Sequence, residues 1–175
     1  KGHHRLLTRI GIDLTGRAQV LVRGQPKQGP HRLHIGFHTR KGSDTIVKGT
    51  LIRRRNQDSL AVLTPFGTTK SQSFFAVLDG HGENGHHISL FVMQILVTGL
   101  KKFVLRFEPM RALKEACALA NSELSTNKKV DSYVSGTTAV LVLLTGRDLY
   151  CCNIGDSRCV LGRKFGDLVE AISLS

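Results

Sequence analysis

The chain has 175 residues, of which 41% are hydrophobic, and it carries 25 Lys and Arg against 13 Asp and Glu, a formal net charge of +12. This length suits one domain with a sizeable core, and the apolar content excludes an intrinsically disordered chain. No stretch approaches the roughly 20 apolar residues of a membrane-spanning helix, and no signal peptide is visible.

The positive charge is concentrated near the N-terminus. Residues 1–55 hold 13 Lys and Arg and only two acidic residues, whereas the rest of the chain holds 12 against 11. Because glycines and prolines interrupt it, the segment 1–34 is predicted to be a loosely structured basic extension with one short strand at Gln19–Arg23. The extension is either a solvated tail or a contact for an acidic partner or anionic surface. Without interleaved aromatic residues, nucleic acid is disfavoured.

The remaining segment, 35–175, contains the regular patterns of a folded domain. Alternating or apolar runs predict strands at 35–39, 59–64, 73–78, 137–144, 149–154, 158–162 and 168–174. A polar, glycine-rich loop is expected at 41–49. Helical periodicity covers 85–104, which Asn84 can cap, and Pro109 opens a second helix. Strands, two helices and then strands joined by tight turns predict an α+β domain with antiparallel sheets.

The four cysteines, Cys117, Cys151, Cys152 and Cys159, lack the spacing of a zinc site. Neighbouring residues of a strand point to opposite faces, so Cys151 and Cys152 are not expected to pair. Reduced thiols are typical of a cytoplasmic or nuclear protein.

One turn carries candidate chemistry. The apolar run Phe74–Leu78 leads directly into Asp79-Gly80-His81-Gly82, so rigid backbone places a carboxylate and an imidazole at the tip of a buried strand. A strand that ends in an acidic, glycine-rich turn can hold a metal ion. An ordinary Asp-Gly turn after a strand has the same sequence pattern.

Three further segments accompany this turn: 53–62 with Asp58, 135–140, and 153–158 with Asp156. In this order and spacing, over about residues 36–175, the four segments resemble the metal-dependent Ser/Thr protein phosphatases of the protein phosphatase 2C type. The resemblance implies an antiparallel β-sandwich flanked by helices, in α-β-β-α layers, with a metal site at one end of the sandwich.

The same resemblance implies hydrolysis of phosphoserine and phosphothreonine in proteins by water that two Mg²⁺ or Mn²⁺ ions activate. Asp79 then bridges the two ions, the Gly80 carbonyl binds one of them, and Asp58 anchors the water shell of the second. His81 matches the general acid that protonates the leaving alkoxide. The alternative for His81 is a hydrogen bond within a tight turn.

Two further positions are less sharply defined. Asp156 matches a place where relatives hold an additional, third metal ion, and a turn-stabilising aspartate fits the pattern nearly as well. Arg53 matches the arginine that grips the substrate phosphate, although the three consecutive arginines 53–55 leave this alignment open by one or two residues. Gln57 stands where some relatives have Glu, and Arg158 is expected to be structural.

The family's catalytic domain continues beyond the last residue of this chain, where it supplies more metal-binding aspartates. The segment 35–175 is therefore expected to be the N-terminal portion of such a domain, incomplete at its C-terminus and inactive by itself. The alternative is a non-catalytic binding module that uses the basic extension and an exposed sheet edge. An unpaired edge favours dimerisation or pairing with the missing half.

Overall fold

The computed structural model describes residues 9–15, 19–23, 34–52, 54–69, 71–128 and 130–175. Its largest element is a five-stranded sheet with the strand order β11-β10-β7-β6-β2. The strands are β2 (Gln19–Arg23), β6 (Ser59–Leu63), β7 (Gln72–Leu78), β10 (Ala139–Thr145) and β11 (Asp148–Ile154). All pairs are antiparallel except β2 with β6, which is parallel. The strand predicted at Gln19–Arg23 is confirmed.

The central strands of this sheet are buried on both faces. Successive side chains of a strand point to opposite faces. On β6, Ala61 and Leu63 accordingly belong to one hydrophobic core, whereas Leu60 and Val62 belong to a second. Since both faces are covered, the polar residues of these strands lie at the strand ends.

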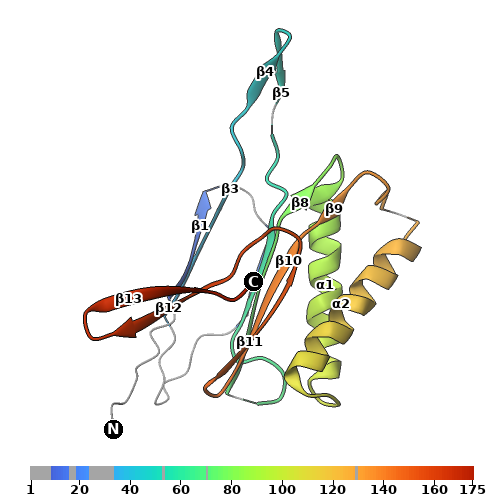
Figure 1. Cartoon of the computed structure of the whole chain (residues 1–175). Coiled ribbons are helices and arrows are strands. Elements are labelled where there is room, and N and C mark those ends of the chain that lie inside the picture. The colour runs from blue at the N-terminus through green and yellow to red at the C-terminus, as the bar shows by residue number, and fades with distance from the viewer. Residues whose placement is uncertain (1–8, 16–18, 24–33, 53, 70, 129) are drawn as a thin grey trace.

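Two helices cover one face of the sheet: α1 (Gly85–Phe103) and α2 (Pro109–Thr126) (Figure 1). Both helices are amphipathic, and α2 begins with proline in its first turn, where the missing N–H costs nothing. Asn84 precedes α1, but its side chain makes no capping bond, contrary to the prediction. Its φ of −103° and ψ of 11° lie outside the usual capping conformation, and its carbonyl accepts the first N–H groups instead. Neither helix is long and apolar enough to cross a membrane, within the part of the chain described.

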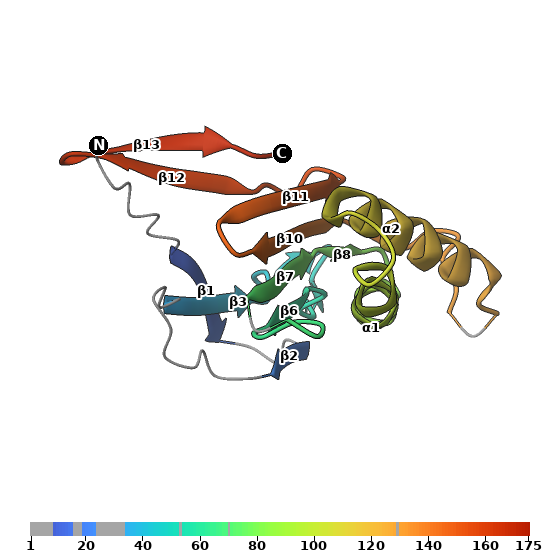
Figure 2. The same ribbon diagram turned by 90° about the horizontal axis from the view of Figure 1, so that it is seen from below.

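Residues 35–37 and Cys159 cover part of the opposite face. β3 (His34–Arg40) pairs in parallel with β1 (Arg9–Thr15), and β12 (Val160–Phe165) forms a hairpin with β13 (Leu168–Ser173). Ile35, Phe37 and Cys159 pack against the second core, and Figure 2 shows these strands away from the helices. The predicted α+β class is confirmed, and the described elements form α-β-β layers with helices on one face. Strand β1 was not predicted.

The predicted polar loop at 41–49 instead includes strand β4 (Thr45–Val47), which forms a hairpin with the following strand β5 (Thr50–Ile52). Lys48 and Gly49 have φ of 49° and 82°, the conformation of a two-residue hairpin turn. The hairpin projects from the body of the molecule, which leaves the Ile46 side chain exposed (Figure 1). Two short strands of two residues each, β8 (Gly80–His81) and β9 (Gly136–Thr137), pair with each other.

Candidate metal centre

The two predicted carboxylates, Asp58 and Asp79, flank two neighbouring strands at the same end. Strands β6 and β7 are antiparallel, and Ser59 at the start of β6 pairs with Leu78 at the end of β7. Asp58 precedes Ser59 and Asp79 follows Leu78, so the strand register brings the two acidic residues together. Both line one cleft of about 600 Å³, together with Gly80. The structure therefore joins three of the predicted metal-binding residues.

A ring of hydrogen bonds orients Asp58. The Thr39 hydroxyl donates to Asp58 Oδ2 at 2.8 Å, and Asn56 Nδ2 donates to Thr39 Oγ1 at 2.8 Å. The Asn56 side-chain oxygen in turn accepts the backbone N–H of Asp58 at 3.0 Å. Thr39 is buried at the end of β3, whereas Asp58 and Asn56 are half-buried. The carboxylate of Asp58 is thus held in one direction, with its Oδ1 available to a ligand.

The backbone of Asp79 is fixed by the two threonines of the Ser-Gly-Thr-Thr segment. Its N–H donates to Thr138 Oγ1 at 3.0 Å, and its carbonyl accepts Thr138 N at 2.9 Å and Thr137 Oγ1 at 3.1 Å. This segment leads through β9 into β10, where a strand was predicted at 137–144. Asp79 itself is exposed, so its carboxylate is accessible at a rigid strand tip.

Three carboxylates share the electrostatic environment of this turn. Partial burial first, and then repulsion from Asp58 and Asp156, raise the pKa of Asp79, while His81 lowers it. A cation bound between these groups would reverse the repulsion, because opposite charge favours the ionised carboxylate. Asp156 lies in the exposed turn after β11 and does not line the cleft. Asp156 is therefore close enough to Asp79 to affect its pKa, but it is not part of the cleft lining.

His81 faces a second cavity, of about 340 Å³, on the side of the helices. Its ring lies over Gly136, the residue with which it pairs between β8 and β9: a Cβ added to Gly136 would be 2.8 Å from His81 Nε2. The structure therefore places the imidazole close enough to influence Asp79, yet outside the cleft that Asp58 and Asp79 line.

Glycine is required where the turn meets the start of α1. A Cβ added to Gly80 would lie 2.4 Å from the Gly85 carbonyl oxygen and 2.5 Å from that of Gln57. The Gln57 carbonyl also accepts a hydrogen bond from Ser89 of α1 at 2.6 Å. Gln57, adjacent to Asp58, is thus packed against the helix, which ties the two acidic segments to one rigid support.

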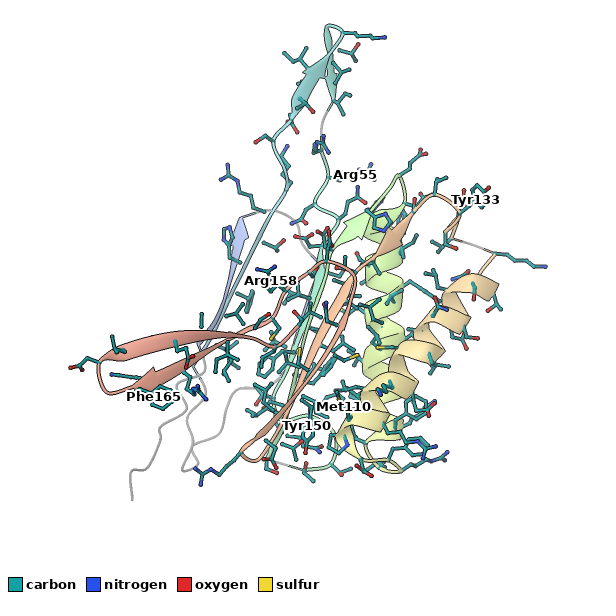
Figure 3. The ribbon with its side chains drawn as sticks, viewed as in Figure 1. Arg55, Met110, Tyr133, Tyr150, Arg158 and Phe165 are labelled. Carbon is teal, nitrogen blue, oxygen red and sulfur yellow. The ribbon has the colours of Figure 1, made fainter. Side chains whose placement is uncertain are left out.

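Sequence reasoning missed four residues that line the cleft: Arg40, Lys41, Glu83 and His86. Arg54 and Arg55, which the open alignment of the three arginines had left as alternatives to Arg53, also line it. Arg55 Nη1 lies 3.1 Å from His86 Nε2, and Figure 3 shows Arg55 at the base of the β4–β5 hairpin. Partial burial, followed by His87 and Arg55, lowers the pKa of His86, which favours the neutral imidazole that can accept this bond. The run of three arginines was the available signal, and it left the choice among residues 53–55 open.

The remaining predicted residues have simpler outcomes. Arg53 lies outside the described residues. Arg158 is exposed in the loop before β12 rather than at the start of a strand (Figure 3). Across the described ranges, no group of three or more His, Cys, Asp or Glu side chains is arranged to hold a metal ion. Asp58, Asp79 and the Gly80 carbonyl supply hard oxygen donors of the kind that Mg²⁺ and Mn²⁺ prefer, but only part of a ligand set.

Comparison with known proteins gives consistent results. The family described as "Protein phosphatase 2C" matches residues 34–172. "Probable protein phosphatase 2C 35" of Arabidopsis thaliana is 37% identical over 123 residues, which cover 70% of this chain and 35% of that protein. The chain spans about a third of the length of the curated relatives it matches.

Two solved structures share the fold. The serine-threonine phosphatase 2C of Toxoplasma gondii is 19% identical with a TM-score of 0.59, covering 70% of this chain and 46% of that one. The catalytic domain of the serine/threonine phosphatase PstP, in complex with two manganese ions, is 22% identical with a TM-score of 0.50, covering 78% and 53%. Another structure of PstP comes from Mycobacterium tuberculosis.

Proposed function

This chain belongs to the protein phosphatase 2C family, and we propose that the whole protein hydrolyses phosphoserine and phosphothreonine in phosphoprotein substrates with two Mg²⁺ or Mn²⁺ ions. When bound, such ions polarise the phosphoryl oxygens and make a coordinated water a stronger nucleophile. The two manganese ions of the PstP structure support this assignment.

The observation that carries the proposal is the convergence of Asp58 and Asp79 on one cleft, with the pKa of Asp79 raised by burial and by the neighbouring carboxylates. In the proposed site Asp79 and the Gly80 carbonyl would hold the ions, and Asp58 would accept hydrogen bonds from the water bound to them. The Thr39 hydroxyl orients Asp58, and the Thr138 hydroxyl and N–H hold the backbone of Asp79.

Three further residues belong to the proposed site. His81 is the proposed donor of a proton to the leaving alkoxide, supported by its influence on Asp79 but not by its cavity. Asp156 is proposed to bind an additional ion, and its repulsive effect on the pKa of Asp79 supports this role. Arg53, on resemblance alone, is proposed to bind the substrate phosphate.

The proposal is tested by phosphate release from a phosphothreonine peptide, with the whole protein in Mn²⁺ and in excess EDTA. We expect Asp79→Asn to lower the rate by orders of magnitude and chelation to abolish it. Asp167→Asn, in the exposed β12–β13 turn, is the control and should retain the parent rate. A parent rate that survives EDTA unchanged would contradict a metal-activated water.

The second candidate is a non-catalytic binding module, favoured by the lack of three converging ligands among the described residues. The same experiment separates the two, because a binding module would release no phosphate at any Mn²⁺ concentration. We further propose a cytoplasmic or nuclear location, supported by four free cysteines, and an acidic partner for the basic segment 1–34, most of which lies outside the described residues.

A further inference from the structure

A group of basic side chains lines the same cleft as the carboxylates. Arg40 ends β3 and Lys41 follows it, whereas Arg54 and Arg55 lie after β5, so the group occupies both legs of the β4–β5 hairpin. Figure 1 shows that these legs run beside the end of the sheet where β8 lies. All four side chains are exposed. We refer to Arg40, Arg54 and Arg55 as the arginine wall.

The side chains of the arginine wall form no ion pair among the described residues. Lys41 forms an ion pair with Asp44 at 2.8 Å. Arg40, Arg54 and Arg55, by contrast, make no ion pair with any carboxylate in the part of the chain that the structure describes. The hydrogen-bond partner of Arg55 is the His86 imidazole, whose lowered pKa favours its uncharged form. Three guanidinium groups without an ion-paired carboxylate therefore line the cleft, which also holds the Asp58, Asp79 and Glu83 carboxylates.

The positions of these groups are partly fixed. The backbone N–H of Arg54 donates to Asp44 Oδ1 at 2.9 Å, and the side-chain stem of Arg54 packs near Gly42, where an added Cβ would be 3.5 Å from Arg54 Cδ. The Arg55–His86 hydrogen bond connects the wall to the first turn of α1. A guanidinium held in place loses less conformational entropy when it binds, and its planar fork matches carboxylate and phosphate groups.

We propose that the arginine wall selects substrates with further anionic groups beside the phosphorylated residue, either acidic side chains or a second phosphate. This inference rests on the proposed phosphatase function. The three guanidiniums lie on both legs of the hairpin and line the same cleft as Asp58 and Asp79, so they offer contacts for anionic groups in addition to the phosphoryl group. A polyanionic peptide can occupy both regions at once, whereas a neutral peptide leaves the wall facing water.

The test uses the whole protein in Mn²⁺ and three peptides with the same phosphothreonine. One has flanking Glu residues, the second has Gln at those positions, and the third has a second phosphothreonine in place of the Glu residues. We expect kcat/KM to be higher for both anionic peptides than for the Gln peptide, mainly through KM. The Glu peptide and the doubly phosphorylated peptide show which anion the wall prefers.

Arg40→Gln and Arg54→Gln should each reduce the preference for the anionic peptides about two- to fivefold, the range for an exposed charge pair, and the preference should fall with added salt. Lys101→Gln, in the last turn of α1 and away from the cleft, removes the same charge and should preserve the preference. Equal kcat/KM for the Glu and Gln peptides, or a preference unchanged in both arginine variants, overturns the proposal.

Measuring peptide affinity separately from phosphate release distinguishes a failure of the arginine wall from a failure of the proposed phosphatase function. If the protein releases no phosphate, fluorescence anisotropy of the labelled peptides without metal still compares their affinities. If the anionic peptides bind more tightly than the Gln peptide, and if Arg40→Gln and Arg54→Gln weaken that binding, the arginine wall is supported even though the lack of phosphate release refutes catalysis. Equal binding of all three peptides refutes the wall, whatever the catalytic result.

Discussion

The substitution Thr39→Val probes how the fold prepares the metal centre. Valine keeps the shape of threonine but removes the hydroxyl that donates to Asp58 Oδ2 and accepts from Asn56 Nδ2, each at 2.8 Å. A hydrogen bond to a charged group contributes roughly 1.5–3 kcal/mol, and an unpaired buried amide costs roughly 1–3 kcal/mol. Because Asp58 and Asn56 are only half-buried, water can replace part of the hydrogen bonding that each of them loses. We expect the free energy of unfolding to fall by about 2 kcal/mol.

For a chain of this size that loss corresponds to a decrease in Tm of about 4–8 °C, measured by thermal unfolding without metal. We also expect Thr39→Val to weaken Mn²⁺ binding, because substitution of a residue that orients a metal-binding carboxylate typically lowers metal affinity by about 10–100-fold. Titration of the whole protein with Mn²⁺ by calorimetry measures this second effect. Thr39→Ser retains the hydroxyl and should bind Mn²⁺ nearly as the parent does.

Thr126→Val is the matched control, since that hydroxyl bonds only to backbone carbonyls at the exposed end of α2. Its Mn²⁺ affinity should equal that of the parent. If Thr39→Val bound Mn²⁺ as tightly as the parent while losing stability, Thr39 would support only the fold. The reasoning that Asp58 is oriented for a metal site would then be refuted.

Three other perturbations test the packing, the charge and the completeness of the site. Gly80→Ala should lower the free energy of unfolding in urea by at least about 1–3 kcal/mol, because its Cβ would meet two backbone carbonyls, whereas Gly162→Ala should change little. The fold raises the pKa of Asp79, so its ionised form destabilises the metal-free protein as pH rises through that pKa. Asp79→Asn should therefore increase stability at pH 7 without metal and not below about pH 3; lower stability at pH 7 would exclude the repulsion. With Mn²⁺, the 175-residue chain alone should release phosphate far more slowly than the whole protein, and equal rates would show that Asp58 and Asp79 suffice.

The core of the metal centre was predictable because it is encoded locally. Apolar runs bounded by turn residues gave β6 and β7, and Asp58 and Asp79 occupy the tips of these strands. Their meeting depends on the antiparallel register, which the turn between the strands and the burial of both faces constrain. The two helices followed from their apolar periodicity and from Pro109.

The residues that support the site were not predictable in the same way. Thr39 is 19 positions from Asp58 in the sequence, and only the packing of β3 against the second core brings its hydroxyl to the carboxylate. Strand β1 lies in a segment rich in charge and glycine, so its pairing with β3 overrides weak local signals. The side of the turn that His81 faces depends on β9, more than 50 residues later.

The central claim is that Asp58 and Asp79 hold divalent cations in one cleft. Anomalous diffraction from crystals of the whole protein grown with Mn²⁺ tests it most directly. The account predicts manganese peaks in the cleft, with Asp79 and the Gly80 carbonyl as direct ligands and Asp58 beside the bound water. Manganese absent from the cleft, with the Asp58 and Asp79 side chains turned away from each other, would contradict it.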